Sequence, residues 1–169
     1  DQVESLAESD DRISEAISMA KRSDVVFLCL GLNATLEGEE GDANNNYAGA
    51  DKKDLNLPSS QIRLMEAICK LNKKVVLLLS TGSAMELSYA SEHCNAIMQT
   101  WYPGQMGGLA AGKLLFGEES PSGRLPIPFY KTTKELPDFS DYSMKNRTYR
   151  YMENRALYPF GFGLSYAKF

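Results

Sequence analysis

The sequence predicts an α/β protein, a three-layer α/β/α sandwich with a mainly parallel sheet of about six strands. Apolar runs rich in strand-forming residues alternate with segments of helical periodicity as far as Gly117. The apolar runs show no polar alternation, which is typical of strands covered on both faces, as in a parallel sheet. Right-handed crossovers would then leave the loops at the carboxyl ends of the strands along one edge, where ligands bind in open sheets.

Composition limits the class of protein. The 169 residues suffice for one domain with a real core, so we expect a single domain over residues 1–169. With 43% hydrophobic and 24% charged residues, the chain resembles ordinary globular domains. The net charge of −4 and the absence of long basic runs argue against nucleic acid and against an anionic membrane surface as partners. Residues 1–11 are polar and acidic, unlike a signal peptide, and the compartment stays open between bacterial cytoplasm, periplasm and secretion.

The first half of the chain contains two helix–strand units separated by a long polar segment. Apolar residues at helical spacing predict a helix over residues 10–22, and a continuous apolar run predicts a strand over 25–32. After the polar segment, Pro58 opens a second helix with Leu64, Ile68 and Leu71 on its buried face. A second buried strand is expected over residues 75–79.

The second half continues the alternation and then changes character. We expect a short helix over 85–92, a strand over 96–100 and a helix over 107–115 that Gly117 ends. Residues 131–147 are polar and predict a surface connection. The aromatic and glycine-rich residues 149–169 predict a terminal strand or arm that packs on the sandwich or on a neighbour.

Cysteine and histidine residues offer little chemistry. Cys29, Cys69 and Cys94 lack metal-type spacing, so we expect buried free thiols and neither a metal nor a cofactor. His93 has no sequence neighbour that would complete a catalytic triad, which favours a surface or capping role.

The polar segment after the first strand is the best candidate for chemistry. It concentrates carboxylates among glycines: Glu37, Glu39, Glu40, Asp42, Asp51 and Asp54. Like charges raise one another's pKa, which can keep a carboxyl group protonated for general acid/base catalysis at a glycosidic oxygen. A solvated loop or a Ca²⁺ site would use the same residue types.

Other local signals are weaker. Gly82 after a strand and Gly107-Gly108 before a helix are positioned like phosphate-binding glycines but match no nucleotide fingerprint. A flavodoxin-like domain would place its phosphate turn after the first strand, where this chain has the acidic segment. Trp101-Tyr102 could stack on a sugar, but a core position is favoured for this aromatic pair.

Four separated motifs carry a family resemblance. They are Asp51-Lys52 with Leu55-Asn56-Leu57-Pro58, Trp101-Tyr102-Pro103-Gly104-Gln105, Pro121-Ser122-Gly123-Arg124-Leu125-Pro126, and the tail from Leu157-Tyr158-Pro159-Phe160-Gly161 onward. In this order and spacing they resemble the C-terminal sandwich domain of glycoside hydrolase family 3, from about residue 10 to the end of the chain.

The resemblance implies a retaining β-glycosidase whose acid/base is a glutamate on a sandwich loop. By its position Glu37 best matches that acid/base, and Glu39 and Glu40 are near alternatives. The resemblance also implies that Asp42, Asp51 and Lys52 bind substrate. Lys52 replaces the usual arginine, and an ammonium group cannot form the planar bidentate contact of a guanidinium group.

The resemblance also implies a partner. The nucleophile would be an aspartate of an N-terminal (β/α)₈-type barrel domain, so we expect the isolated chain to be inactive. The implied substrates are β-xylosides or β-glucosides, with the β-xylosidases closer in their loop and tail motifs. The alternative is a non-catalytic sugar-binding or scaffold module with the same fold.

Overall fold

The sheet and its connections confirm the predicted α/β class. The computed structural model describes residues 12–33, 36–37, 52, 54–152 and 156–168. Three parallel strands, in the order β1-β2-β3, form the sheet of the described residues: β1 (Val25–Gly31), β2 (Lys74–Ser80) and β3 (Ala96–Gln99). Their register pairs Val25 with Lys74 and Val76 with Ala96. About six strands were expected, and the described residues account for three of them.

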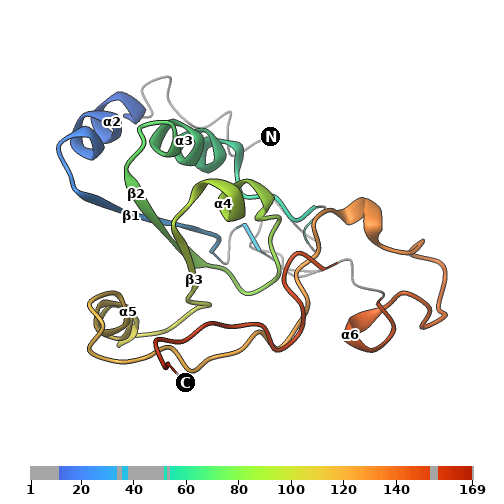
Figure 1. The fold of residues 1–169 in the computed structure, drawn as a ribbon. Coiled ribbons are helices and arrows are strands. Elements are labelled where there is room, and N and C mark those ends of the chain that lie inside the picture. The colour runs from blue at the N-terminus through green and yellow to red at the C-terminus, as the bar shows by residue number, and fades with distance from the viewer. Residues whose placement is uncertain (1–11, 34–35, 38–51, 53, 153–155, 169) are drawn as a thin grey trace.

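Helices lie on both sides of this sheet (Figure 1). The helices α2 (Ile13–Lys21), α3 (Ser59–Cys69) and α4 (Ser88–His93) cover one face, whereas α5 (Gly107–Leu115) lies on the other. The sandwich layers are therefore those predicted from the alternation of strands and helices. Across the described ranges, no helix has both the length and the apolar character needed to cross a membrane.

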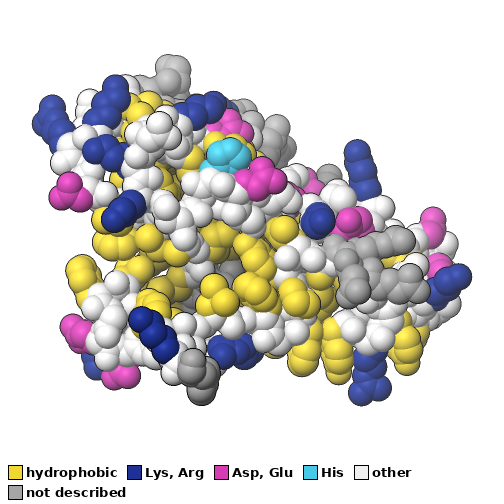
Figure 2. Space-filling view, in the orientation of Figure 1, with side chains coloured by type: hydrophobic (Ala, Val, Ile, Leu, Met, Phe, Trp, Pro, Cys, Tyr) yellow, Lys and Arg dark blue, Asp and Glu magenta, His cyan; other side chains and the backbone are white. Residues whose placement is uncertain are grey.

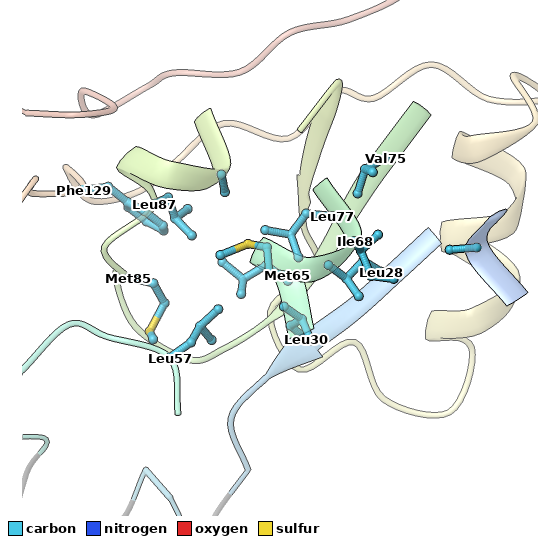
Figure 3. Close-up of a cluster of buried hydrophobic side chains, with 13 residues drawn as sticks. Leu28, Leu30, Leu57, Met65, Ile68, Val75, Leu77, Met85, Leu87 and Phe129 are labelled. Atoms are coloured by element: carbon cyan, nitrogen blue, oxygen red, sulfur yellow. The ribbon is translucent and has the colours of Figure 1, made fainter. Parts of the chain in front are cut away.

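The core lies between β1, β2 and the helices above them (Figure 3). Alternate residues of the strands point into it, as the two-residue period of a strand requires: Leu28 and Leu30 from β1, and Val75, Leu77 and Leu79 from β2. Met65 and Ile68 of α3 pack on them, together with Phe129 from the distal part of the chain. Burial of each such side chain contributes on the order of 1.5–3 kcal/mol.

The segment between β2 and α4 differs from the prediction. A helix was expected from residue 85, but α4 begins at Ser88. Met85 and Leu87 precede the helix and are nevertheless buried in the core. The apolar spacing therefore reported burial correctly but overestimated the length of the helix.

The second face of β1 is open, which contradicts the expectation that this strand is covered on both faces. Val25 and Phe27 are exposed, and an edge contact with Phe116, just after α5, leaves Phe27 44% exposed. Figure 2 shows hydrophobic side chains at the surface between the α2–α4 layer and α5. Cys29 is likewise exposed, so its expected burial is wrong, whereas Cys69 and Cys94 are half-buried.

The C-terminal segment packs against the sandwich as an arm. Residues 131–147 contain a short 3₁₀ turn, η1 (Thr133–Glu135), and α6 (Thr148–Tyr151) follows. Phe129 and Tyr158 form an isolated antiparallel bridge, and the amide of Leu125 donates to the carbonyl of Phe162 over 2.9 Å. The Tyr166 hydroxyl donates to the Leu114 carbonyl at the end of α5 over 2.8 Å. A single bridge lies where the sequence predicted a terminal strand or arm.

Candidate functional site

Three loops at the carboxyl ends of the strands meet at one carboxylate. Glu37 follows β1, Gly82 and Ser83 follow β2, and Tyr102 follows β3. Because the strands are parallel, their carboxyl ends share one edge of the sheet, which is where α/β proteins bind ligands. The site therefore assembles residues that are 45 to 65 positions apart in the sequence.

The Glu37 carboxylate accepts hydrogen bonds on both oxygens. Its Oε2 accepts the Gly82 amide at 2.9 Å and the Tyr102 hydroxyl. Its Oε1 accepts the Ser83 hydroxyl. The Glu37 side chain is itself only 16% exposed, although Tyr102 remains half-exposed.

Lys52 supplies the positive charge of the site. Its Nζ lies 3.9 Å from Glu37 Oε1 and is equally shielded from solvent. The same ammonium donates to the Ala84 carbonyl and to the Met85 sulfur, each at 3.2 Å. Lys52 therefore links Glu37 to the segment after β2. It makes one contact with each partner, as expected for an ammonium group, which carries its charge on a single atom.

A turn at the end of β1 aims Glu37 toward the other loops. The Leu36 and Glu37 amides both donate to the Asn33 carbonyl, at 3.0 and 2.9 Å. The Asn33 side chain also accepts a hydrogen bond from the Leu36 amide at 3.2 Å, which reinforces the backbone contact of the turn.

Polar side chains join the loops after β2 and β3. Gln99, the last residue of β3, donates to the carbonyl and to the hydroxyl of the buried Thr81, at 3.0 and 3.1 Å. The hydroxyls of Ser80 and Thr100 lie 2.8 Å apart. These bonds fix the spacing between the two loops that hold Glu37.

Trp101 and Gly82 shape the site through their backbones. Trp101 has a φ of 56°, an uncommon left-handed conformation for a bulky residue, directly before the Tyr102 that contacts Glu37. A Cβ at Gly82 would lie 2.9 Å from the Tyr102 ring and 3.2 Å from Glu37 Oε2. A glycine at this position allows Tyr102 and Glu37 to approach the backbone together.

These contacts set the charge of the site. Burial alone would raise the pKa of Glu37, but hydrogen bonds from Ser83, Tyr102 and Gly82 and the charge of Lys52 outweigh it, and the pKa lies below its ordinary value of 4.5. Burial and the neighbouring Glu37 anion raise the pKa of Tyr102 to about 12. Near neutral pH the site holds an ionised Glu37 and a protonated Tyr102.

The predicted site residues divide into two groups. Glu37 and Lys52 lie together, whereas Glu39, Glu40, Asp42 and Asp51 fall outside the described residues. Trp101 packs against the core as expected, with its ring edge on Phe129. Tyr102 was expected in the core but is half-exposed at the site.

No motif in the sequence assigned Ser83 or Gly82 to this site. Their position directly after a buried parallel strand was the available signal, since such loops line the ligand edge of the sheet. His93, by contrast, lies at the surface as predicted, with Nδ1 2.9 Å from the Tyr89 carbonyl.

Comparison with known proteins gives a consistent result. Residues 1–166 match the model of the glycosyl hydrolase family 3 C-terminal domain. A xylan 1,4-β-xylosidase from Xylanibacter ruminicola is 44% identical over 156 residues, which are 92% of this chain and 18% of that protein. A β-glucosidase from Rhizobium radiobacter is 35% identical over 95% of this chain and 20% of its own length.

Solved structures agree with these relatives. The crystal structure of a family 3 β-glucosidase from Bifidobacterium adolescentis superposes with a TM-score of 0.79 at 31% identity. The match covers 96% of this chain and 25% of that one. The chain thus spans a quarter or less of the proteins that it matches.

Proposed function

This chain belongs to glycoside hydrolase family 3 as its C-terminal domain, and we propose that it supplies the general acid/base of a retaining β-glycosidase. The proposal rests on one observation above all. The acidic loop that contains Glu37, Glu39, Glu40 and Asp42 starts at the carboxyl edge of the sheet, and its first carboxylate is bonded there to the loops after β2 and β3.

The mechanism needs two carboxyl groups about 5–5.5 Å apart, one as nucleophile and one as acid and then base. We propose that a (β/α)₈-type barrel domain of the same enzyme contributes the nucleophilic aspartate. This aspartate attacks the anomeric carbon while a protonated glutamate of the acidic loop donates its proton to the leaving oxygen. The same glutamate then removes a proton from the water that hydrolyses the glycosyl-enzyme.

The substrate class follows from the relatives. We propose that the substrates are terminal β-linked sugars and that β-xylosides are preferred to β-glucosides. The relative that is 44% identical is named a xylan 1,4-β-xylosidase. Asp42, Asp51 and Lys52 would help to bind the sugar. Of these, Lys52 holds its ammonium beside Glu37, where it would also favour the anionic form of nearby carboxyl groups.

Alanine variants of the three glutamates in the full-length enzyme test the proposal. Loss of the acid/base should abolish hydrolysis of β-glycosides with poor leaving groups, spare those with good leaving groups, and be rescued by azide. We expect this signature at one of Glu37, Glu39 and Glu40. Its absence at all three would contradict the proposal and favour a non-catalytic sugar-binding or scaffold module.

A further inference from the structure

We infer that Glu37 is a positioning residue, an anionic anchor that ties the start of the acidic loop to the ends of β2 and β3, and that it does not carry the transferred proton. The inference rests on the proposed function and refines it. It assigns different roles to glutamates that the sequence alone could only treat as alternatives.

Two of the four groups around Glu37 can donate a hydrogen bond but cannot accept one. Ser83 and Tyr102 carry hydroxyls, which can reverse and accept a hydrogen bond. The Gly82 amide on Oε2 and the Lys52 ammonium beside Oε1 can only donate. Each oxygen therefore faces a group that opposes a proton on that oxygen, so the site is built for a carboxylate and not for a carboxylic acid.

The surroundings of Glu37 lower its pKa, which is unfavourable for a proton donor. A general acid works best with a pKa near the operating pH, so it requires an environment that raises a carboxyl pKa. The hydrogen bonds to Glu37 and the charge of Lys52 lower the pKa of this carboxyl group. Together they outweigh burial, which alone would raise that pKa.

Glu37 connects three loops at the edge of the sheet. One side chain joins the loop after β1 to two loops that are themselves cross-linked through Gln99 and Thr81. Glu37 also lies in a hydrogen-bonded turn, since its amide donates to Asn33. A carboxylate residue fixed at both its backbone and its side chain holds the start of the acidic loop at the edge of the sheet. Small misplacements of groups in an active site lower the reaction rate strongly.

Kinetics of the full-length enzyme separate an anchor from a proton donor. For Glu37→Ala we expect kcat/KM to fall roughly 100-fold on good and on poor leaving groups alike, with no rescue by azide. The basic limb of its pH profile should remain, because the proton donor is still present. Selective loss on poor leaving groups with azide rescue at Glu37 would overturn the inference.

Two milder variants provide graded support. Gly82→Ala places a methyl group between Tyr102 and Glu37, and Tyr102→Phe removes one donor, so each should reproduce the Glu37→Ala pattern at a smaller, roughly 3- to 30-fold, loss. Glu92→Ala, an exposed change on α4, is the matched control and should leave kcat/KM unchanged. Unaltered kinetics in Gly82→Ala and Tyr102→Phe would contradict the anchor.

Hydrogen exchange keeps this inference separate from the proposed function. The Gly82 amide should exchange slowly in the full-length enzyme and at least tenfold faster in Glu37→Gln, whatever the reaction catalysed. If that acceleration occurs while Glu39→Ala and Glu40→Ala show no azide rescue, the anchor stands and the proposed acid/base role of the loop fails. Equal exchange in wild type and Glu37→Gln would refute the anchor itself.

Discussion

The sulfur atoms of Cys69 and Cys94 lie 3.8 Å apart, although Cys69 is the last residue of α3 and Cys94 directly follows α4. Burial raises the pKa of both thiols, that of Cys94 to about 12. The pair is therefore close and weakly reactive near neutral pH, since the thiolate is the reactive form.

We predict that a thiol–disulfide oxidant such as oxidised glutathione joins these two cysteines slowly, and faster as the pH rises. The cross-link closes a loop of moderate length, so it should raise the free energy of unfolding by about 3 kcal/mol. Thermal unfolding with and without oxidant measures the change, and mass spectrometry of the linked peptides identifies the bond. Cys69→Ser is the control and should show neither effect; a bond through Cys29 instead would contradict the prediction.

The ionisation of Glu37 should make stability depend on pH. Its pKa in the folded protein is below 4.5, so its favourable contribution is complete above that value and is lost as the pH falls through the folded pKa. Denaturant unfolding of wild type and Glu37→Gln should therefore give a difference that shrinks between about pH 6 and pH 3. A difference for Glu37→Gln that stays constant over this pH range would argue against the anion.

Tyr102→Phe should weaken the site without disturbing the core. The change removes one hydrogen bond to a charged group at a half-exposed position, and we expect a loss of about 1 kcal/mol in unfolding free energy. The pKa of Glu37 should rise at the same time, which a carbon-detected NMR titration can follow. Tyr142→Phe, at a tyrosine that is 89% exposed, is the control and should change neither quantity.

Gly31→Ala should destabilise the end of β1 severely. A Cβ there would lie 2.0 Å from the Ser80 carbonyl oxygen of β2, and Gln61 already bonds the Gly31 amide and carbonyl at 2.9 and 2.8 Å. Because backbone atoms cannot move aside cheaply, we expect a loss of roughly 1–3 kcal/mol or more. Gly112→Ala on α5 is the control, because a Cβ at this position meets open space. Alanine favours the helix more than glycine does, so this change should raise the free energy of unfolding by about 0.5–1 kcal/mol. Equal effects of the two changes in denaturant unfolding would contradict this account.

Local patterns along the chain were sufficient to predict most of the fold. The apolar spacing of α2 and the continuous apolar runs of β1 and β2 reflect which residues face the core. This pattern can be recognised within a short window of sequence, so it predicts the type of element. The same patterns failed where a distant element decides the outcome. The exposure of one face of β1 and the start of α4 at Ser88 depend on which distant segments pack against them. The spacing of apolar residues within a short stretch of sequence contains no information about those segments.

For the candidate site, residue patterns predicted an acidic loop after the first strand, with Glu37 and Lys52 among its candidate residues. The groups that surround Glu37 could be identified only after folding. Gly82, Ser83 and Tyr102 are 45 to 65 residues away along the chain and reach it because parallel strands bring their carboxyl ends to one edge. A carboxyl group takes its charge from its surroundings, so crowded carboxylates suggested a proton donor, whereas the folded chain surrounds Glu37 with donors that favour an anion.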